Sequence, residues 1–341
     1  MLNRLFINIK KMFQLSLSPF KFRKYLKKGL YKYNVATTIL FRYPVEYNNV
    51  PTVFGNIETN KNILRILFSK LFFYRNNFTK QVFNGDYMIV SSSESEFKFF
   101  DIDKKRILTY YSDESKLNFV SKQRIEWSKW LRTVEFTVDL ANKTLIEPLI
   151  STTNYKTEDA FAQIQKDYLK YIVDASNDMR SYYSIDKQRL DSFCNLWNDK
   201  DLYDSIIKFI ADNPIPVLNT HGDLWRANIL FDGQYYYYID FEQAAPRLFF
   251  YDIFMYILSD AFILKDNLLF KDFLEGKFDD YLQLISQKLN YQFIASQKYY
   301  YLALFSFEWY CNRWYGTQDS NLVVEVSNLV ISQYNEYGLQ I

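Results

Sequence analysis

The residues whose types and spacing could do chemistry together lie in one stretch, 219–242. The only histidine of the chain, His221, is followed two residues on by Asp223 and five further by Asn228. A second carboxylate, Asp240, comes at the end of the stretch, after two short apolar runs. These four residues place two carboxylates, an amide and an imidazole within a short length of chain.

The two apolar runs, 229–231 and 235–239, are strand-like because they are rich in aromatic and β-branched residues. The Asp-Gly pair at 232–233 joins them and tolerates the positive φ of a tight hairpin turn. Folding this hairpin back brings the loop before it beside Asp240. We expect the carboxylates and the amide to converge there.

Oxygen ligands of this kind suit Mg²⁺, which takes one or two carboxylates together with substrate phosphates. Phosphoryl transfer needs a carboxylate to accept the hydroxyl proton and metal ligands to neutralise phosphate charge. This interpretation assigns Asp223 as the base, and Asn228 and Asp240 as Mg²⁺ ligands. The alternative is a buried polar pair of His221 and Asp223 with a turn residue at 228, because H-x-D spacing alone recurs by chance.

The stretch resembles the catalytic segment of the aminoglycoside phosphotransferase and choline kinase family, relatives of the protein kinases. That family carries a loop reading H-G-D-L-x-x-x-N-I-L and a metal motif reading I-D-F/W-E, which 221–224, 228–230 and 239–242 match. Asp252 resembles the family's later aspartate, which supports the catalytic loop from the next helix. The stretch that contains these matches, 221–252, covers only about a tenth of the chain.

The resemblance implies an α+β, bilobal protein kinase-like fold, with a small antiparallel-sheet N-lobe and a larger, mainly helical C-lobe. We place a basic N-terminal extension with amphipathic helices at 1–85, the N-lobe at 86–150 and the C-lobe at 151–341. The pattern predicts strands and helices in the following order: a helix at 62–76, strands at 87–90, 97–101 and 106–111, a helix at 113–130, strands at 134–140 and 144–150, and helices at 157–180, 186–212, 251–264, 268–288, 294–315 and 320–337.

Within the expected N-lobe, the serine-rich link 91–95 takes the place of the family's phosphate-covering loop. Ser92 and Ser93 could contact phosphate there, or the link could be an ordinary turn. The segment 145–149, with Glu147, takes the place of the interlobe hinge, where backbone groups would hold adenine.

The clearest departure from the family lies in the third strand, where a lysine should hold the nucleotide phosphates. The expected register places Thr109 there. Glu126 is available as the helix partner of such a lysine, and either Lys98 on the neighbouring strand or Arg106 could reach in. The missing lysine puts nucleotide affinity and rate in question.

Two further residues of the stretch allow two interpretations. A histidine beside a carboxylate suggests a general base, whereas the resemblance implies a structural role for His221 in holding the catalytic loop. Arg226, three residues after Asp223, is close enough in sequence to reach the transferred phosphate and partly replace the missing lysine.

Composition narrows the cellular setting. Two cysteines, Cys194 and Cys311, are too few for a disulfide framework, which fits a reducing cytoplasm. No apolar run reaches the roughly 18 residues that a membrane-spanning helix needs. Residues 1–85 hold fifteen of the 41 basic residues but two of the 39 acidic ones.

The basic segment 1–45 fits an anionic membrane surface at the inner face of the membrane. It also fits packing on the acidic remainder of the chain, or a solubilising tail. We expect no nucleic acid partner, because no recognised binding module accompanies the charge.

The predicted function is transfer of the γ-phosphate of ATP or GTP to a hydroxyl of a small molecule, such as a sugar, an amino alcohol or an envelope glycan intermediate. Aromatic residues of 305–315, together with Glu308 and Arg313, either line the acceptor pocket or form core. The alternative function is a kinase-like nucleotide-binding or scaffold protein with weak or no turnover.

Overall fold

In the computed structural model, the described residues are 18–34, 39–43, 73–90, 96–176, 181–197, 199, 201–313 and 321–337. The chain divides into two compact units. The first comprises Met1–Glu126, Thr133–Asn154 and Leu230–Tyr237, and the second comprises Trp127–Arg132, Tyr155–Ile229 and Tyr238–Ile341. None of the helices in the described ranges has both the length and the apolar character that crossing a bilayer requires.

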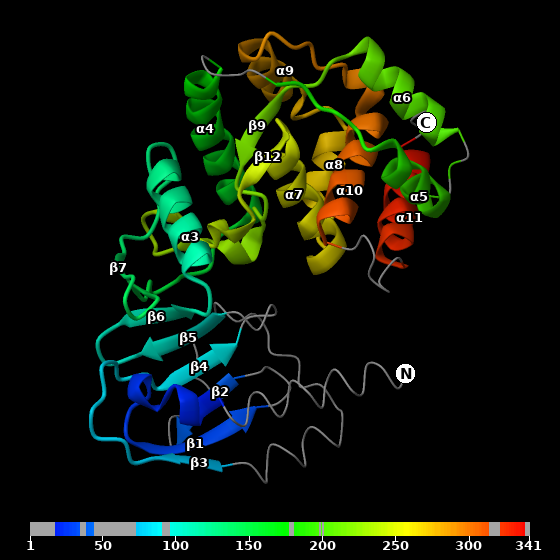
Figure 1. Ribbon diagram of the computed structural model, residues 1–341. Helices are drawn as coiled ribbons and strands as arrows, with labels where there is room; N and C mark the ends of the chain where they lie inside the picture. Colours follow the sequence, from blue (N-terminus) through cyan, green and yellow to red (C-terminus); the bar gives the residue numbers. More distant parts are fainter. Residues whose placement is uncertain are drawn as a thin grey trace. The chain divides into compact units, whose positions relative to one another are not determined.

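The first unit is built on one antiparallel sheet, whose described strands run in the order β3-β1-β2-β4-β5-β6-β8-β7 (Figure 1). The short 3₁₀-helix η1 (Arg23–Tyr25) precedes the strands. The strands are β1 (Gly29–Asn34), β2 (Ile39–Tyr43), β3 (Phe73–Asn76), β4 (Tyr87–Val90), β5 (Glu96–Asp101), β6 (Arg106–Tyr111), β7 (Thr137–Asp139) and β8 (Thr144–Pro148). The helix α3 (Glu114–Trp127) follows β6, so the predicted order of three strands, a helix and two strands is confirmed.

The two faces of this sheet carry different partners, because successive side chains of a strand point to opposite sides. On one face, Phe99 and Leu108 pack with Phe22 and Tyr25 of the N-terminal segment. On the other face, α3 packs through Leu117 and Val120 onto Tyr111 and Leu145.

The predicted helix at 62–76 is wrong for its last four residues, which form the edge strand β3. Tyr74 pairs with Tyr31 of β1 and is buried, so pairing with the sheet overrides the helical spacing of the apolar residues. The rest of that predicted helix lies outside the described residues. The boundary predicted at 85/86 falls inside the first unit, because β1, β2 and β3 extend its sheet.

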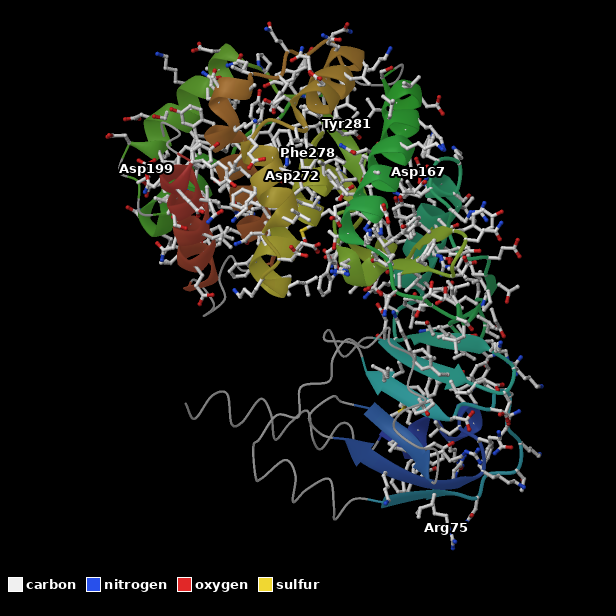
Figure 2. The ribbon with its side chains drawn as sticks, turned by 180° about the vertical axis from the view of Figure 1, so that it is seen from behind. Arg75, Asp167, Asp199, Asp272, Phe278 and Tyr281 are labelled. Carbon is white, nitrogen blue, oxygen red and sulfur yellow. The ribbon has the colours of Figure 1, made fainter. Side chains whose placement is uncertain are left out.

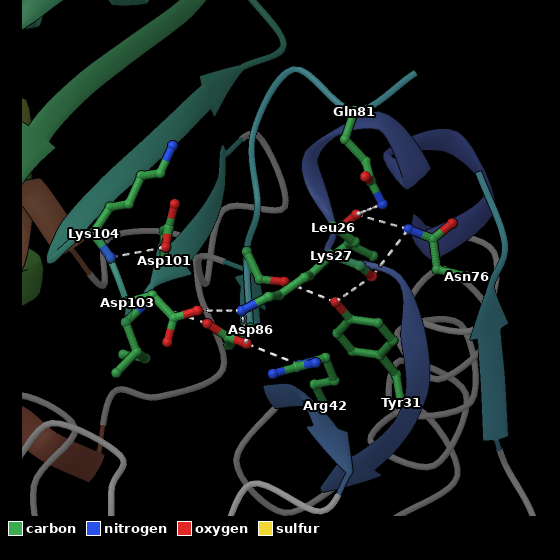
Figure 3. A network of polar contacts seen from close by, with 12 residues as sticks. Leu26, Lys27, Tyr31, Arg42, Asn76, Gln81, Asp86, Asp101, Asp103 and Lys104 are labelled. Carbon is green, nitrogen blue, oxygen red and sulfur yellow. Dashed lines mark hydrogen bonds and ion pairs between the residues drawn. The ribbon is translucent and has the colours of Figure 1, made fainter. Parts of the chain in front are cut away.

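A polar network attaches the basic N-terminal segment to this sheet (Figure 3). Asp86 is buried, and its carboxylate lies 2.9 Å from Arg42 Nε and 3.8 Å from Lys27 Nζ. Lys27 also forms an ion pair with the exposed Asp103. The Asn76 side-chain amide donates a hydrogen bond to the carbonyl of Leu26 (2.7 Å). For these cations the structure supports intramolecular packing; 1–17 lies outside the described residues.

The second unit is mainly helical, with a pair of antiparallel strands, β9 (Val217–Thr220) and β12 (Ala245–Leu248). Its helices are α4 (Thr157–Ala175), α5 (Lys187–Trp197), α6 (Leu202–Asp212), α7 (Tyr251–Ser259), the π-helix η6 (Asp260–Leu264), α8 (Leu268–Leu274), α9 (Asp279–Lys288), the 3₁₀-helix η7 (Ala295–Gln297), α10 (Lys298–Arg313) and α11 (Asn321–Glu336). The structure thus confirms the predicted α+β class, with an antiparallel-sheet unit and a mainly helical unit.

Aromatic packing holds the helices of the second unit together. Near α9, the ring of Phe278 lies 4.8 Å from that of Phe161 on α4, and the Tyr281 hydroxyl donates to the Gln165 carbonyl at 3.1 Å (Figure 2). On α10, Phe305 and Trp309 are buried against neighbouring rings. These two aromatic residues therefore belong to the core, whereas residues 314–315 lie outside the described part.

Candidate active site

The site begins where β9 ends, and a buried carboxylate fixes this end. Asp252 lies in the first turn of α7 and is fully buried. Its Oδ2 accepts a hydrogen bond from the backbone N–H of His221 (2.6 Å), and its Oδ1 accepts one from Gly222 (2.8 Å). Burial raises the pKa of Asp252 to about 7, and the two N–H donors oppose that rise. The supporting role that the sequence predicted for Asp252 matches these contacts.

Gly222 allows a close approach between two turns. Its φ is +79°, and a Cβ at this position would lie 2.0 Å from the backbone carbonyl oxygen of Gln243. Gln243 ends the short 3₁₀-helix η5 (Phe241–Gln243), directly after Asp240. The turn that carries Asp223 and the turn that follows Asp240 therefore touch through their backbones.

The His221 ring connects the same two turns. Its Nε2 lies 2.9 Å from the Ile239 carbonyl oxygen, which can only accept, so Nε2 carries the proton. Its Nδ1 accepts a hydrogen bond from the Asp223 N–H (3.4 Å). Burial lowers the pKa of His221 to about 4, against the opposing effect of the Asp240 carboxylate. The ring is thus a neutral, buried link, as the structural interpretation of His221 expects.

Asn228 is fixed from the side of Asp223. It lies in η4 (Arg226–Asn228) and is buried. Its Nδ2 donates to the Asp223 carbonyl (2.8 Å) and to Asp223 Oδ2 (3.2 Å), which turns its Oδ1 away from that carboxylate. Its own carbonyl accepts the N–H of Ile239 (3.1 Å), the residue before Asp240.

The predicted hairpin is confirmed as β10 (Ile229–Phe231) and β11 (Tyr236–Tyr238), with Gly233 at φ +98° in the turn. Asp240 follows the second strand in the left-handed region, at φ 68°. Aspartate tolerates this conformation better than most residues. Left-handed backbone here turns the chain into η5 at the point where the two turns meet.

Three side chains of these turns carry oxygen atoms of the kind that Mg²⁺ takes as ligands. Among the described residues, no group of three or more His, Cys, Asp or Glu side chains is arranged to hold a metal ion. Mg²⁺ does not need such a group, since one or two carboxylates with substrate phosphates and water suffice. Asp223, Asn228 and Asp240 come from two linked turns and offer two carboxylates and an amide oxygen.

Arg226 lies at the edge of this loop, against Tyr155. Its guanidinium is 5.5 Å from the centre of the Tyr155 ring, and Nη2 lies 3.4 Å from the Tyr155 carbonyl oxygen. The Tyr155 hydroxyl donates in return to the carbonyls of Arg226 (3.0 Å) and Ile229 (3.2 Å). The Arg226 charge also acts on the buried carboxylate of Asp260, whose pKa burial raises to about 6.

The residues predicted to bind nucleotide belong to the first unit. Ser92 and Ser93 lie outside the described residues. Thr109 is buried on β6, and its cross-strand partner on β5 is Lys98. Thr109 also pairs with Leu145 of β8. Because cross-strand partners share one face of a sheet, Lys98, Thr109 and Leu145 lie on the same face, which is the face that α3 covers.

Ion pairs connect α3 to the sheet. Arg124 Nη1 lies 2.6 Å from the carboxylate of Glu147 on β8, and Lys116 pairs with the buried Glu96 on β5. Glu147 is therefore held by Arg124. The remaining predicted candidate, Arg106, pairs with Asp101 at 3.2 Å.

The sequence did not single out Arg247 or Asp260, both of which the structure buries near the loop. Arg247 had a signal: it follows Pro246 and precedes the apolar run 248–251, and an arginine among apolar residues requires a partner when buried. Asp260 had none, because the π-helix that contains it is not visible in the apolar spacing.

No family model and no curated protein matches this chain. Among solved structures, it is similar to choline kinase LicA from Streptococcus pneumoniae, with 13% identity over 73% of this chain and 92% of that one, at a TM-score of 0.42. A glucosamine kinase in complex with glucosamine, ADP and inorganic phosphate shows 11% identity over 74% and 82%, at 0.44. A thermostable mutant of aminoglycoside phosphotransferase APH(4)-Ia, in complex with ADP and hygromycin B, shows 11% over 73% and 94%, at 0.39. The chain is thus similar in structure, at low identity, to kinases of the choline, glucosamine and aminoglycoside kinds.

Proposed function

We propose that this protein is a Mg²⁺-dependent kinase that transfers the γ-phosphate of ATP or GTP to a hydroxyl group of a small molecule. The observation that carries the proposal is the link between two turns through one buried imidazole. His221 contacts the turn of Asp223 with one nitrogen and the residue before Asp240 with the other. We infer that this link keeps the turn of the proposed base beside the turn of one proposed metal ligand, Asp240.

Each residue has one role in this proposal. Asp223 orients the acceptor hydroxyl and takes its proton as the acceptor oxygen bonds to the γ-phosphorus, while the bond from that phosphorus to the bridging oxygen of the β-phosphate breaks and ADP or GDP leaves. Asn228 Oδ1 and the Asp240 carboxylate hold Mg²⁺, which when bound neutralises charge on the nucleotide phosphates. His221 and Asp252 touch no reacting atom and keep the two turns in place. Positioning and charge neutralisation supply most of the rate in such reactions.

The acceptor class in this proposal is a sugar, an amino alcohol or an envelope glycan intermediate. An assay for the release of ADP from ATP or of GDP from GTP, run with a panel of these hydroxyl compounds, identifies the acceptor and the nucleotide. We expect Asp223→Asn to lower turnover by about 10²–10⁴-fold, the usual contribution of a general base. Asp240→Asn should have at least that effect and should raise the Mg²⁺ concentration needed for half-maximal rate.

Asp212→Asn serves as the matched control. This aspartate ends α6 and is exposed, so the same chemical change should leave turnover within about twofold of wild type. If Asp223→Asn and Asp212→Asn changed the release of ADP equally, the proposed role of Asp223 would be contradicted.

A second candidate function is nucleotide binding without turnover. Thr109, buried on β6 where a phosphate-binding lysine was expected, favours it. In that case a fluorescent nucleotide would bind the wild-type protein, whereas no acceptor in the panel would stimulate release of ADP.

We also propose a cytoplasmic location, peripheral at the inner face of a membrane, on the charge of 1–45 alone. Wild type should bind vesicles of anionic lipid but not of neutral lipid, and Lys10→Gln with Lys11→Gln should weaken this binding. Equal binding by the double variant would remove the support for this location.

A further inference from the structure

The backbone carbonyl of Gln243 is the point at which the two turns of the candidate site touch. A Cβ at Gly222 would lie 2.0 Å from the oxygen of this carbonyl, so the contact has no room to shorten. Gln243 is three residues after Asp240, and Gly222 is directly before Asp223. This carbonyl therefore lies at the contact between the turn of the proposed base and the turn of the proposed metal ligand.

Arg247 also contacts that carbonyl. Its Nη2 donates a hydrogen bond to the Gln243 oxygen (3.2 Å). The side chain is only 6% exposed, and its guanidinium lies 4.8 Å from the centre of the Tyr251 ring. Its backbone belongs to β12, where it pairs with Leu218 of β9 (Figure 1). The guanidinium thus reaches the carbonyl from a paired strand.

Glu308 of α10 supplies the countercharge. Its Oε2 lies 3.9 Å from Arg247 Nη1, and the carboxylate is 17% exposed. Burial raises the pKa of Glu308, whereas a hydrogen bond from Tyr183 and the charge of Arg247 lower it. Two neighbours on the same helix, Phe305 and Phe307, are buried in the core. The countercharge is therefore fixed to a well-packed helix.

We propose that Arg247, oriented by Glu308, is a positioning residue that sets the spacing between the turn of Asp223 and the turn of Asp240. This inference rests on the proposed function, and it assigns Arg247 no contact with substrate or metal. A planar guanidinium can bond Gln243 with one nitrogen and face Glu308 with another. A lysine keeps the charge but lacks that fork, so it can serve only one of the two partners.

The first test measures the environment of the His221 ring between the two turns and does not require turnover. Labelling histidine with ¹⁵N in the full chain gives one imidazole, because His221 is the only histidine. In wild type we expect a neutral ring with its proton on Nε2, bonded to Ile239. In Arg247→Lys the Nε2 proton should shift and exchange with water about tenfold faster, because the turn that includes Ile239 loosens.

The matched control is Arg189→Lys. Arg189 is 44% exposed and pairs with Asp186 at 3.2 Å. Its substitution by lysine should leave the His221 signal unchanged. Glu308→Gln keeps the shape of the side chain and removes its charge, so it should move the same signal to a smaller extent. This second variant keeps the test decisive if Arg247→Lys does not fold.

The second test reads the reaction. Arg247→Lys should lower kcat about 10–100-fold and raise the Mg²⁺ concentration for half-maximal rate, with a smaller effect on the acceptor KM. The double variant with Glu308→Gln should be little worse than Arg247→Lys alone, because residues that act as a unit are not additive.

A lower thermal midpoint with wild-type kcat, Mg²⁺ requirement and His221 signal would overturn the inference, since it would indicate a purely structural role. Additive effects of the two substitutions on kcat would also overturn it. If wild type turned over no acceptor but Arg247→Lys still moved the His221 signal, the proposed function would fail and the positioning by Arg247 would stand.

Discussion

At the scale of single residues, the charge state of His221 follows from its burial. The ring is fully buried between two turns, and each nitrogen has a backbone partner that suits the neutral form. A protonated ring would carry a proton on Nδ1 that faces the Asp223 N–H. The Asp223 N–H would then lose its acceptor, and two N–H groups would point at each other. The fold therefore opposes protonation of His221.

This burial predicts an unusual titration. The ¹⁵N shifts of His221 should stay those of the neutral ring from pH 8 to pH 5 and change with a midpoint near 4, the value to which burial lowers its pKa. A midpoint near 6.5 would show that the ring is not held as described.

The lowered pKa of His221 also makes the free energy of unfolding depend on pH. Between about pH 6.5 and pH 4 the unfolded chain binds a proton at this residue and the folded chain does not. The contribution of His221 to the free energy of unfolding is therefore present above pH 6.5 and is lost as the pH falls towards 4, by about 3 kcal/mol in total.

At the scale of elements, two glycines with positive φ differ in their surroundings: one lies in an open turn and the other at a close contact between two turns. Gly222 and Gly233 have φ of +79° and +98°, but a Cβ would meet a backbone oxygen at 2.0 Å in the first and nothing nearer than 3.8 Å in the second. Backbone strain is common to both, and only Gly222 carries the steric conflict. Comparing the same substitution at the two glycines therefore separates the effect of the contact between the turns from the effect of backbone strain.

We expect Gly233→Ala to lower the free energy of unfolding by about 1–2 kcal/mol, the cost of left-handed backbone in a residue with a Cβ. Gly222→Ala should cost clearly more, because a further 1–3 kcal/mol or above is typical of forced overpacking, and it should remove most turnover. Chemical denaturation and the ADP assay measure the two effects. Equal loss of stability in both variants would contradict the close approach of Gly222 and Gln243.

The sequence predicted elements well where local signals were strong. The Asp-Gly turn of the hairpin and the helix α3 each have a signature in the chain itself. It failed at β3, because pairing with β1 is a long-range contact that apolar spacing does not reveal.

The candidate site divides in the same way. The sequence alone indicated the stretch from His221 to Asp252, because one hairpin and one short connection link its residues. It did not indicate that Lys98 lies across from Thr109, since cross-strand register depends on turns with no signature. Nor did it reveal Arg247, whose partners Gln243 and Glu308 come from different elements.

At the scale of the whole molecule, the basic N-terminal segment contributes to the sheet of the first unit. Its strands β1 and β2 lie between β3 and β4, and Asp86 binds cations from β2 and from the residues before β1. Deleting 1–45 would remove two inner strands, so charge-changing substitutions test any membrane role more cleanly than truncation does.

The two carboxylates that contact Lys27 give a matched pair of substitutions. Asp86→Asn should lower the free energy of unfolding of the first unit by about 2 kcal/mol, because Asp86 is 3% exposed and also bonds Arg42. Asp103→Asn should cause no resolvable change, since Asp103 is 71% exposed.

Thermal unfolding measures both variants, and the His221 signal should stay unchanged because His221 lies in the other unit. Equal destabilisation by the two substitutions would show that the burial of Asp86 has no bearing on stability.

The hairpin 230–237 belongs to the first unit, although the second unit supplies the chain on either side of it. The Thr153 N–H donates to the Phe231 carbonyl (2.7 Å), which ties the hairpin to the end of the sheet-bearing segment. A ribosome must therefore synthesise the chain beyond residue 237 before the first unit is complete, and by then much of the second unit has emerged. A gene fragment that stops at residue 154 would encode a sheet that lacks this last piece.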